Sequence, residues 1–110
     1  MDNVKKTSLG MDENIEAALS YFFWIFTGIL FFVLEKDNKF VRFHAMQSIA
    51  VSIVLGVITI ILAITIVGLL LLPLIYLIVV ILWIFLMYKA YKGEKFKLPV
   101  VGDFAEKQVV

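Results

Sequence analysis

The chain has 110 residues, of which 63% are hydrophobic and 17% are charged. Water-soluble proteins average about 45–50% apolar and about 25% charged residues. A soluble domain of this length buries about two-thirds of its surface, so much of the apolar excess would face water. The composition therefore excludes a soluble enzyme, a nucleic-acid-binding domain and a disordered segment, and it predicts a membrane protein.

Residues that usually carry catalysis are scarce in this sequence. The chain has no cysteine and one histidine, which excludes disulfides and thiolate nucleophiles and leaves too few ligands for a typical metal site. No aspartate or glutamate lies inside the two long uncharged stretches described next. We therefore expect a protein that is not an enzyme and that needs no cofactor and no metal ion.

Charged residues leave two long uncharged stretches in the chain. The first has eighteen residues, 17–34, and the second has forty-six residues, 43–88. One helical crossing of a bilayer core of about 30 Å takes about 20 residues, so the first stretch fits one crossing and the second fits two. Gly68 and Pro73 predict the turn inside the second stretch, while a turn placed earlier, around Thr65, is the alternative.

These lengths predict an all-α polytopic membrane protein, a single membrane domain over 1–110 with three transmembrane helices in an antiparallel bundle. Helices are expected because every backbone N–H and C=O in lipid must be paired within its own segment. The expected parts are a mobile N-terminus 1–11, a helix 12–34, a polar turn 35–42, a helix 43–66, an apolar turn 67–73, a helix over about 69–91 and a basic tail 92–110.

Lysine and arginine are unequally distributed between the two sides of this predicted bundle. With three crossings, eight of them lie on the side of the first turn and the C-terminal tail, and two, Lys5 and Lys6, lie on the other. Positively charged loops are retained in the cytoplasm. The count predicts a multi-pass plasma-membrane protein with its N-terminus outside and its C-terminus in the cytoplasm. An even number of crossings, with 43–88 forming one re-entrant element, is the alternative.

The candidate functional residues share one face of the helix predicted over 43–66. The face consists of His44, Gln47, Ser48, Ser52 and Gly56. Polar groups within a span often form a binding or proton-handling site. The alternative, which we favour, is that these residues hydrogen-bond and pack against a neighbouring helix, because small residues allow helices to approach closely in lipid.

Basic and aromatic residues follow the last predicted helix. They are Lys89, Tyr91, Lys92, Lys95 and Lys97. Basic residues near a bilayer attract anionic lipid headgroups by about 1 kcal/mol each, so the sequence predicts a lipid-surface anchor at the cytoplasmic face. Charge that merely sets the topology is the alternative. Acidic residues among these lysines argue against a nucleic-acid partner.

Two short motifs in the sequence resemble the Tic-twenty-like family of small membrane proteins. The motifs are Phe43-His44-Ala45-Met46-Gln47-Ser48 and, further along, Lys89-Ala90-Tyr91-Lys92-Gly93-Glu94 with Pro99. This family includes prokaryotic proteins of unknown function and is named for a chloroplast inner-envelope protein-import subunit. The resemblance implies a helical membrane protein with His44 and Gln47 at the start of a helix, and it implies no catalytic residue.

Together these patterns predict a small integral membrane protein that acts as a non-enzymatic assembly or accessory subunit through helix packing. Its partners would be the lipid bilayer and either a second copy or another membrane protein. The alternative is a homo-oligomeric transporter, channel or protein-translocation component in which His44, Gln47 and Ser48 line an opening. Contact of this face with a neighbouring helix of the same chain would favour packing, and a water-filled cavity would favour transport.

Overall fold

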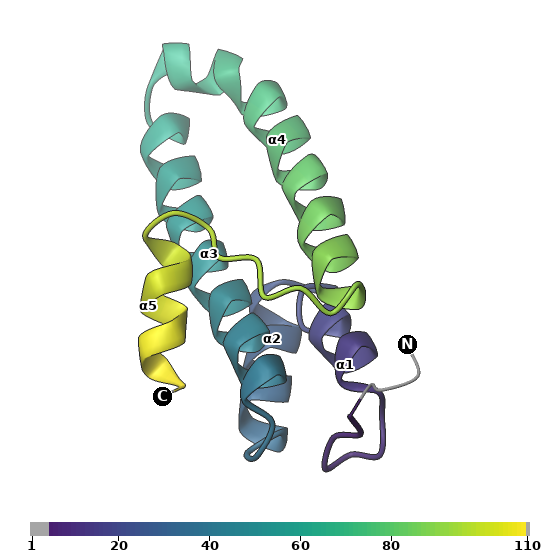
Figure 1. The fold of residues 1–110 in the computed structure, drawn as a ribbon. Coiled ribbons are helices and arrows are strands. Elements are labelled where there is room, and N and C mark those ends of the chain that lie inside the picture. Colours follow the sequence, from purple (N-terminus) through teal and green to yellow (C-terminus); the bar gives the residue numbers. More distant parts are fainter. Residues whose placement is uncertain (1–4, 110) are drawn as a thin grey trace.

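The computed structural model describes residues 5–109, and this part of the chain folds into five helices without a β-strand (Figure 1). The helices are α1 (Glu13–Leu19), α2 (Ile25–Leu34), α3 (Lys39–Ala63), α4 (Ile66–Tyr91) and α5 (Val101–Gln108). The predicted all-α class is confirmed for these residues. Residues 1–4 of the expected mobile segment 1–11, and Val110, lie outside the described part of the chain.

The two longest helices, α3 and α4, form an antiparallel hairpin that extends beyond the rest of the molecule (Figure 1). They have 25 and 26 residues, or about 37–39 Å at about 1.5 Å per residue. Both are long and apolar enough to cross a membrane, and they are the two helices of residues 5–109 that meet this criterion. The expectation of three transmembrane helices is therefore not supported.

The turn between α3 and α4 lies at Ile64 and Thr65, not at the expected residues 67–73. Thr65 caps α4 because its Oγ1 accepts a hydrogen bond of 2.9 Å from the Gly68 N–H. A Cβ at Gly68 would lie 1.9 Å from the Leu62 carbonyl oxygen, so this tight turn requires glycine there. Pro73 lies inside α4. The turn near Thr65, the alternative position, is the one that the structure has.

The helix expected over 12–34 is two helices, α1 and α2, that run in opposite directions beside the α3–α4 hairpin (Figure 1). The chain reverses between them at Trp24, whose φ of 51° is incompatible with a continuous right-handed helix. Thr27 stabilises the corner, because its hydroxyl donates to the Ser20 carbonyl and accepts from the Phe23 N–H. α2 has ten residues, about 15 Å, or half of a bilayer core.

The two ends of this α1–α2 hairpin lie together at one end of the molecule. Asn38, which follows α2, donates a hydrogen bond of 2.9 Å to Glu13 at the start of α1. Ser8 donates its backbone N–H to Glu35 over 3.0 Å. A single helix that crossed a bilayer would separate these residues by the thickness of the membrane, so the structure does not have the single long helix expected over 12–34.

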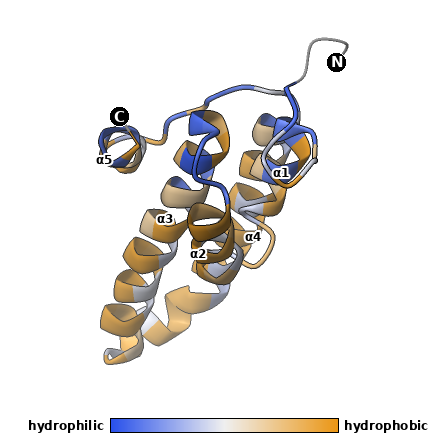
Figure 2. Cartoon of the chain, turned by 90° about the horizontal axis from the view of Figure 1, so that it is seen from below, coloured by the Kyte–Doolittle hydropathy of each residue, from blue (hydrophilic) through white to orange (hydrophobic). Residues whose placement is uncertain are grey.

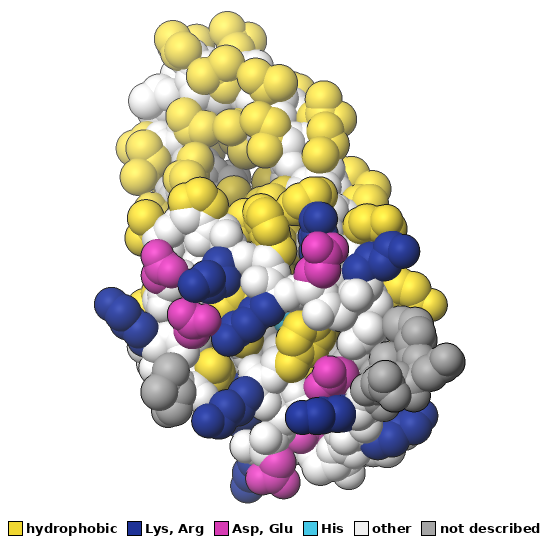
Figure 3. Space-filling model, viewed as in Figure 1, with side chains coloured by type: hydrophobic (Ala, Val, Ile, Leu, Met, Phe, Trp, Pro, Cys, Tyr) yellow, Lys and Arg dark blue, Asp and Glu magenta, His cyan; other side chains and the backbone are white. Residues whose placement is uncertain are grey.

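Charged and apolar side chains occupy opposite ends of the molecule. On the face shown in Figure 3, Lys, Arg, Asp and Glu lie in the lower half, and hydrophobic side chains cover the upper half of α3 and α4. Viewed from below, α2, α3 and α4 are hydrophobic along most of their length, and α5 is largely hydrophilic (Figure 2). The residues from Phe43 to Tyr88, which include the α3–α4 turn, carry no Lys, Arg, Asp or Glu.

The close approach of α2 to α3 depends on Gly28. A Cβ at this position would lie 2.9 Å from the Ala45 carbonyl oxygen and 3.2 Å from the Ser48 Cβ. We expect Gly28→Leu to lower the free energy of unfolding by about 1–3 kcal/mol, because the inserted side chain overpacks this contact. Gly56→Leu is the matched control, since a Cβ at Gly56 meets no atom within 4 Å. Unfolding of the two variants as detergent-solubilised monomers checks this prediction, and equal stabilities would contradict it.

Candidate functional site

Three buried polar side chains, Tyr21, His44 and Gln47, form a connected hydrogen-bond cluster between the α1–α2 corner and α3. All three are nearly inaccessible to solvent. The Tyr21 hydroxyl lies 2.7 Å from His44 Nδ1, and Gln47 Nε2 donates to the Tyr21 hydroxyl over 2.8 Å. His44 and Gln47 are one helical turn apart in α3, so both point toward the same neighbour.

The cluster binds the backbone of the C-terminal tail, which passes across α3. Gln47 Nε2 donates to the Phe96 carbonyl over 3.0 Å, and Gln47 Oε1 accepts from the Leu98 N–H, also over 3.0 Å. His44 Nε2 lies 3.1 Å from the Glu94 carbonyl oxygen. Gln47 thereby uses both amide hydrogens and its carbonyl oxygen. The tail residues that bind His44 and Gln47 are about fifty positions away from them in sequence.

The hydrogen bonds assign the tautomer of His44. A carbonyl oxygen can only accept, so the contact with Glu94 places the proton on His44 Nε2. Nδ1 then accepts from the Tyr21 hydroxyl, whose oxygen accepts from Gln47. Because both ring nitrogens have partners and the ring is buried, His44 has no nitrogen available for a ligand in this state.

Ser48 and Ser52 lie outside the cluster and form hydrogen bonds of their own. The Ser48 hydroxyl donates to the Trp24 carbonyl over 2.8 Å and so joins α3 to the α1–α2 corner. The Ser52 hydroxyl donates to the Ser48 carbonyl within its own helix, over 2.7 Å. The predicted face therefore divides: His44, Gln47 and Ser48 hold separate parts of the fold together, whereas Ser52 does not.

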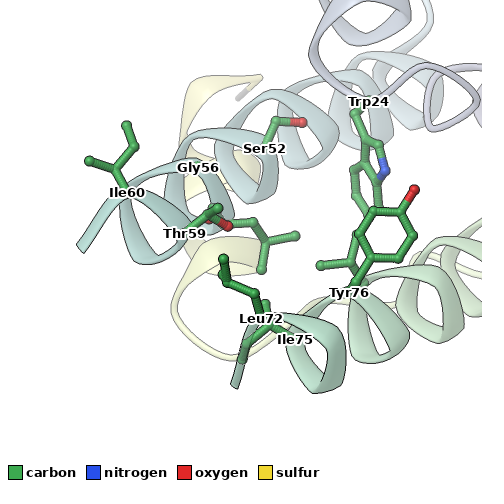
Figure 4. A pocket seen from close by; sticks show the side chains of 10 residues that line it. Trp24, Ser52, Gly56, Thr59, Ile60, Leu72, Ile75 and Tyr76 are labelled. Atoms are coloured by element: carbon green, nitrogen blue, oxygen red, sulfur yellow. The ribbon is translucent and has the colours of Figure 1, made fainter. Parts of the chain in front are cut away.

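An apolar groove of about 590 Å³ opens between the outer parts of α3 and α4 (Figure 4). Ser52, Gly56 and Thr59 lie on its α3 side, Tyr76 lies on its α4 side, and Trp24 from the α1–α2 corner also lines it. None of its lining residues is charged. Ser52 and Gly56, the last two residues of the predicted face, thus border a groove that the described residues do not fill.

Most of the predicted anchor lysines form ion pairs with acidic residues of the tail. Lys89 pairs with Glu94 at 3.3 Å, and Lys95 and Lys97 pair with Glu106 of α5 at 3.1 and 3.2 Å. Hydrogen bonds from these two lysines lower the pKa of Glu106. Lys92 lies over the Tyr88 ring, and Tyr91 is exposed. Binding of this surface to lipid stays a prediction.

Sequence reasoning found the α3 residues of the cluster but missed their partners. Tyr21 was detectable in principle, because a tyrosine within an apolar stretch needs a partner for its hydroxyl when buried. The carbonyls of Glu94 and Phe96 carry no sequence signal. Within residues 5–109, no three His, Asp or Glu side chains lie close enough together to hold a metal ion.

The sequence matches a family model described as the magnetosome magnetite crystal formation protein family over residues 7–105. The chain belongs to this family. It is 62% identical to a UPF0132 membrane protein of Methanocaldococcus jannaschii over 93% of each chain. It is 49% identical to a UPF0132 membrane protein of Archaeoglobus fulgidus over 90% of this chain and 97% of the relative. No solved structure is similar enough to match it.

The expected membership of the Tic-twenty-like family was wrong. The family match spans both motifs on which that resemblance depended, and the relatives are described as UPF0132 membrane proteins. Each motif has six consecutive residues, too few to separate one group of small helical membrane proteins from another. The coarser expectation is confirmed: the chain is a small helical membrane protein of a family whose biochemical activity is unknown.

We expect Gln47→Leu to release the C-terminal tail from α3. The substitution leaves the Phe96 carbonyl and the Leu98 N–H without their side-chain partner, at an expected cost of about 2–3 kcal/mol in the free energy of unfolding. Trypsin should then cleave faster after Lys95 and Lys97. The same substitution at the exposed Gln108 is the matched control, and identical cleavage rates in the two variants would contradict this role of Gln47.

Proposed function

We propose that this protein is a non-enzymatic assembly or accessory subunit in a membrane. It associates with other membrane-spanning helices, in the first place those of a second copy, through the groove between α3 and α4. The observation that carries the proposal is the contrast between two glycines. At Gly28 a side chain would collide with α3, which packs against this residue. At Gly56, by contrast, a Cβ would meet no atom within 4 Å.

The location of the groove supports association. Small residues on a membrane helix allow close contact with another helix, and Ser52, Gly56 and Thr59 present such a surface on α3. Large apolar side chains nearby are also uncovered: Ile60 is 67% exposed and Ile61 is 57% exposed. A membrane helix supplies the complementary apolar surface without any charged group.

The hydrogen-bond cluster makes transport the weaker candidate. A conduit needs polar side chains that face an opening. His44 and Gln47 are instead buried and have partners within the chain, as does Ser48. This is the arrangement expected if the polar face serves folding. The family is described by crystal formation and the relatives as membrane proteins, and neither description names transport.

We further propose that both termini lie in the cytoplasm. The α1–α2 hairpin would enter the membrane from that side and return, and α3 and α4 would cross it. All ten Lys and Arg residues lie outside the stretch from Phe43 to Tyr88, so with two crossings none remains on the far side. This distribution satisfies the positive-inside rule better than the three-span arrangement, which leaves Lys5 and Lys6 outside.

Labelling of introduced cysteines tests this topology, because the chain has none of its own. Ser8→Cys and Gln108→Cys place thiols at exposed positions near the two ends. In intact cells a membrane-impermeant maleimide should label neither variant, and after lysis it should label both. Labelling of Ser8→Cys in intact cells would return the N-terminus to the outside and contradict the two-crossing arrangement.

Filling the groove tests the association. We expect Gly56→Leu to weaken self-association in liposomes at least tenfold, about 1.4 kcal/mol, as measured by energy transfer between labelled copies. Val57→Leu is the matched control, because Val57 is an exposed neighbour on α3 that does not line the groove. If Gly56→Leu associates as the wild type does, the groove is not the contact surface.

A further inference from the structure

Two carboxylates, Glu16 and Glu35, lie together at the base of the α1–α2 hairpin, outside α3 and α4. Both side chains belong to fully buried residues, with 0% of the surface exposed. Thr7 donates its hydroxyl to Glu16 Oε1 over 2.6 Å. Glu35 accepts backbone N–H groups at both oxygens, from Ser8 over 3.0 Å and from Asn38 over 3.1 Å. The pair thus joins the N-terminal segment, α1 and the turn before α3.

The second oxygen of Glu16 is the unusual atom of this group. Glu16 Oε2 is buried and has no hydrogen-bond partner among the described residues. A buried carboxylate oxygen without a partner is costly. A proton on Oε2 removes this cost, because a protonated carboxyl becomes a donor and Glu35, whose carboxylate interacts with Glu16, is an available acceptor.

We propose that Glu16 and Glu35 form a carboxylic acid–carboxylate pair that binds one proton, carried by Glu16, and that this proton holds residues 5–12 against the base of the α1–α2 hairpin. The ligand of the site is the proton itself. A proton from the solvent binds Glu16 Oε2, and the resulting O–H group donates a hydrogen bond to the carboxylate of Glu35. No other co-reactant is needed.

The electrostatic environment assigns the proton to Glu16. Burial raises the pKa of Glu16, the hydrogen bond from Thr7 opposes this, and the neighbouring charge of Glu35 raises the pKa further. Burial also acts to raise the pKa of Glu35, but hydrogen bonds from Ser8 and Asn38 outweigh it and lower the pKa. Opposite shifts within one pair are typical of two carboxyl groups that share a proton.

Neighbouring charges do not neutralise the pair. On the N-terminal segment and α1 they are Lys5, Lys6, Asp12 and Glu13. The turn, the start of α3 and the end of α4 add Lys36, Asp37, Lys39, Arg42, Lys89 and Lys92. Lys6 pairs with Asp12 and Lys89 with Glu94, and Arg42 donates to the backbone carbonyls of Phe32 and Glu35. Among the described residues, no salt bridge reaches the carboxylate of Glu16 or Glu35.

The sign of the pH dependence follows from the two shifts. As pH rises through the raised pKa of Glu16, the proton is lost and two negative charges face each other, so the hold on residues 5–12 is lost. As pH falls through the lowered pKa of Glu35, protonation weakens its carboxyl group as the acceptor of the Ser8 and Asn38 hydrogen bonds. The N-terminal segment is therefore held most firmly between the lowered pKa of Glu35 and the raised pKa of Glu16.

A spin label on Leu9→Cys, in the N-terminal segment, reports this hold in the full-length protein in liposomes. We expect the immobilised component of its spectrum to be lost as pH rises through the raised pKa of Glu16. In Glu16→Gln the amide donates permanently to Glu35, so the component should persist as pH rises. Glu13→Gln is the matched control and should behave as the wild type. A pH-independent spectrum in the wild type, or the same pH dependence in Glu16→Gln and Glu13→Gln, would overturn the proposal.

Two further measurements distinguish a bound proton from a bound metal ion. An infrared pH titration of the wild type should show a carboxylic acid that keeps its proton above the range of ordinary glutamates and that is missing in Glu16→Gln. Its absence in the wild type would overturn the proposal without any variant. Added Mg²⁺ should leave the label unchanged. If Mg²⁺ restores immobilisation at high pH in the wild type and not in Glu16→Gln, the ligand is a divalent cation and the proton assignment is wrong.

Discussion

The arrangement of this protein depends on one constraint: both ends of its first apolar stretch are held at the same end of the molecule. Glu16 and Glu35 flank eighteen uncharged residues and are joined through Thr7, Ser8 and the turn before α3. A stretch fixed at both ends on one side can enter an apolar layer only as a hairpin. The reversal of the chain at Trp24 follows from this.

The same hairpin explains why the polar face of α3 divides into two parts. Where α1 and α2 cover α3, its polar side chains bind them or the C-terminal tail, and His44 and Gln47 are buried. Beyond the corner at Trp24, α3 and α4 have no further cover from the described residues, and the small residues Ser52 and Gly56 border the groove. One continuous sequence pattern thus serves folding at one end and borders an uncovered groove at the other.

Composition and hydropathy were sufficient to predict an all-α membrane protein and to group His44, Gln47 and Ser48 on one helix face. They were insufficient for the arrangement of residues 17–34, because eighteen uncharged residues fit either one long helix or a hairpin of half that length. The reversal at Trp24 has no glycine or proline to mark it. The partners of His44 and Gln47 are tail carbonyls some fifty residues away, and the identity of a side chain does not predict which backbone it will meet.

Cross-linking across the base of the α1–α2 hairpin tests the central claim most directly. In the chain, which lacks cysteine, Glu13→Cys and Asn38→Cys together replace two side chains that are in hydrogen-bond contact. In native membranes a short bifunctional maleimide should join them within one chain, whereas the pair Glu13→Cys and Thr65→Cys should stay unlinked. Failure to link positions 13 and 38, with both thiols reactive but labelled from opposite sides of the membrane, would contradict the account.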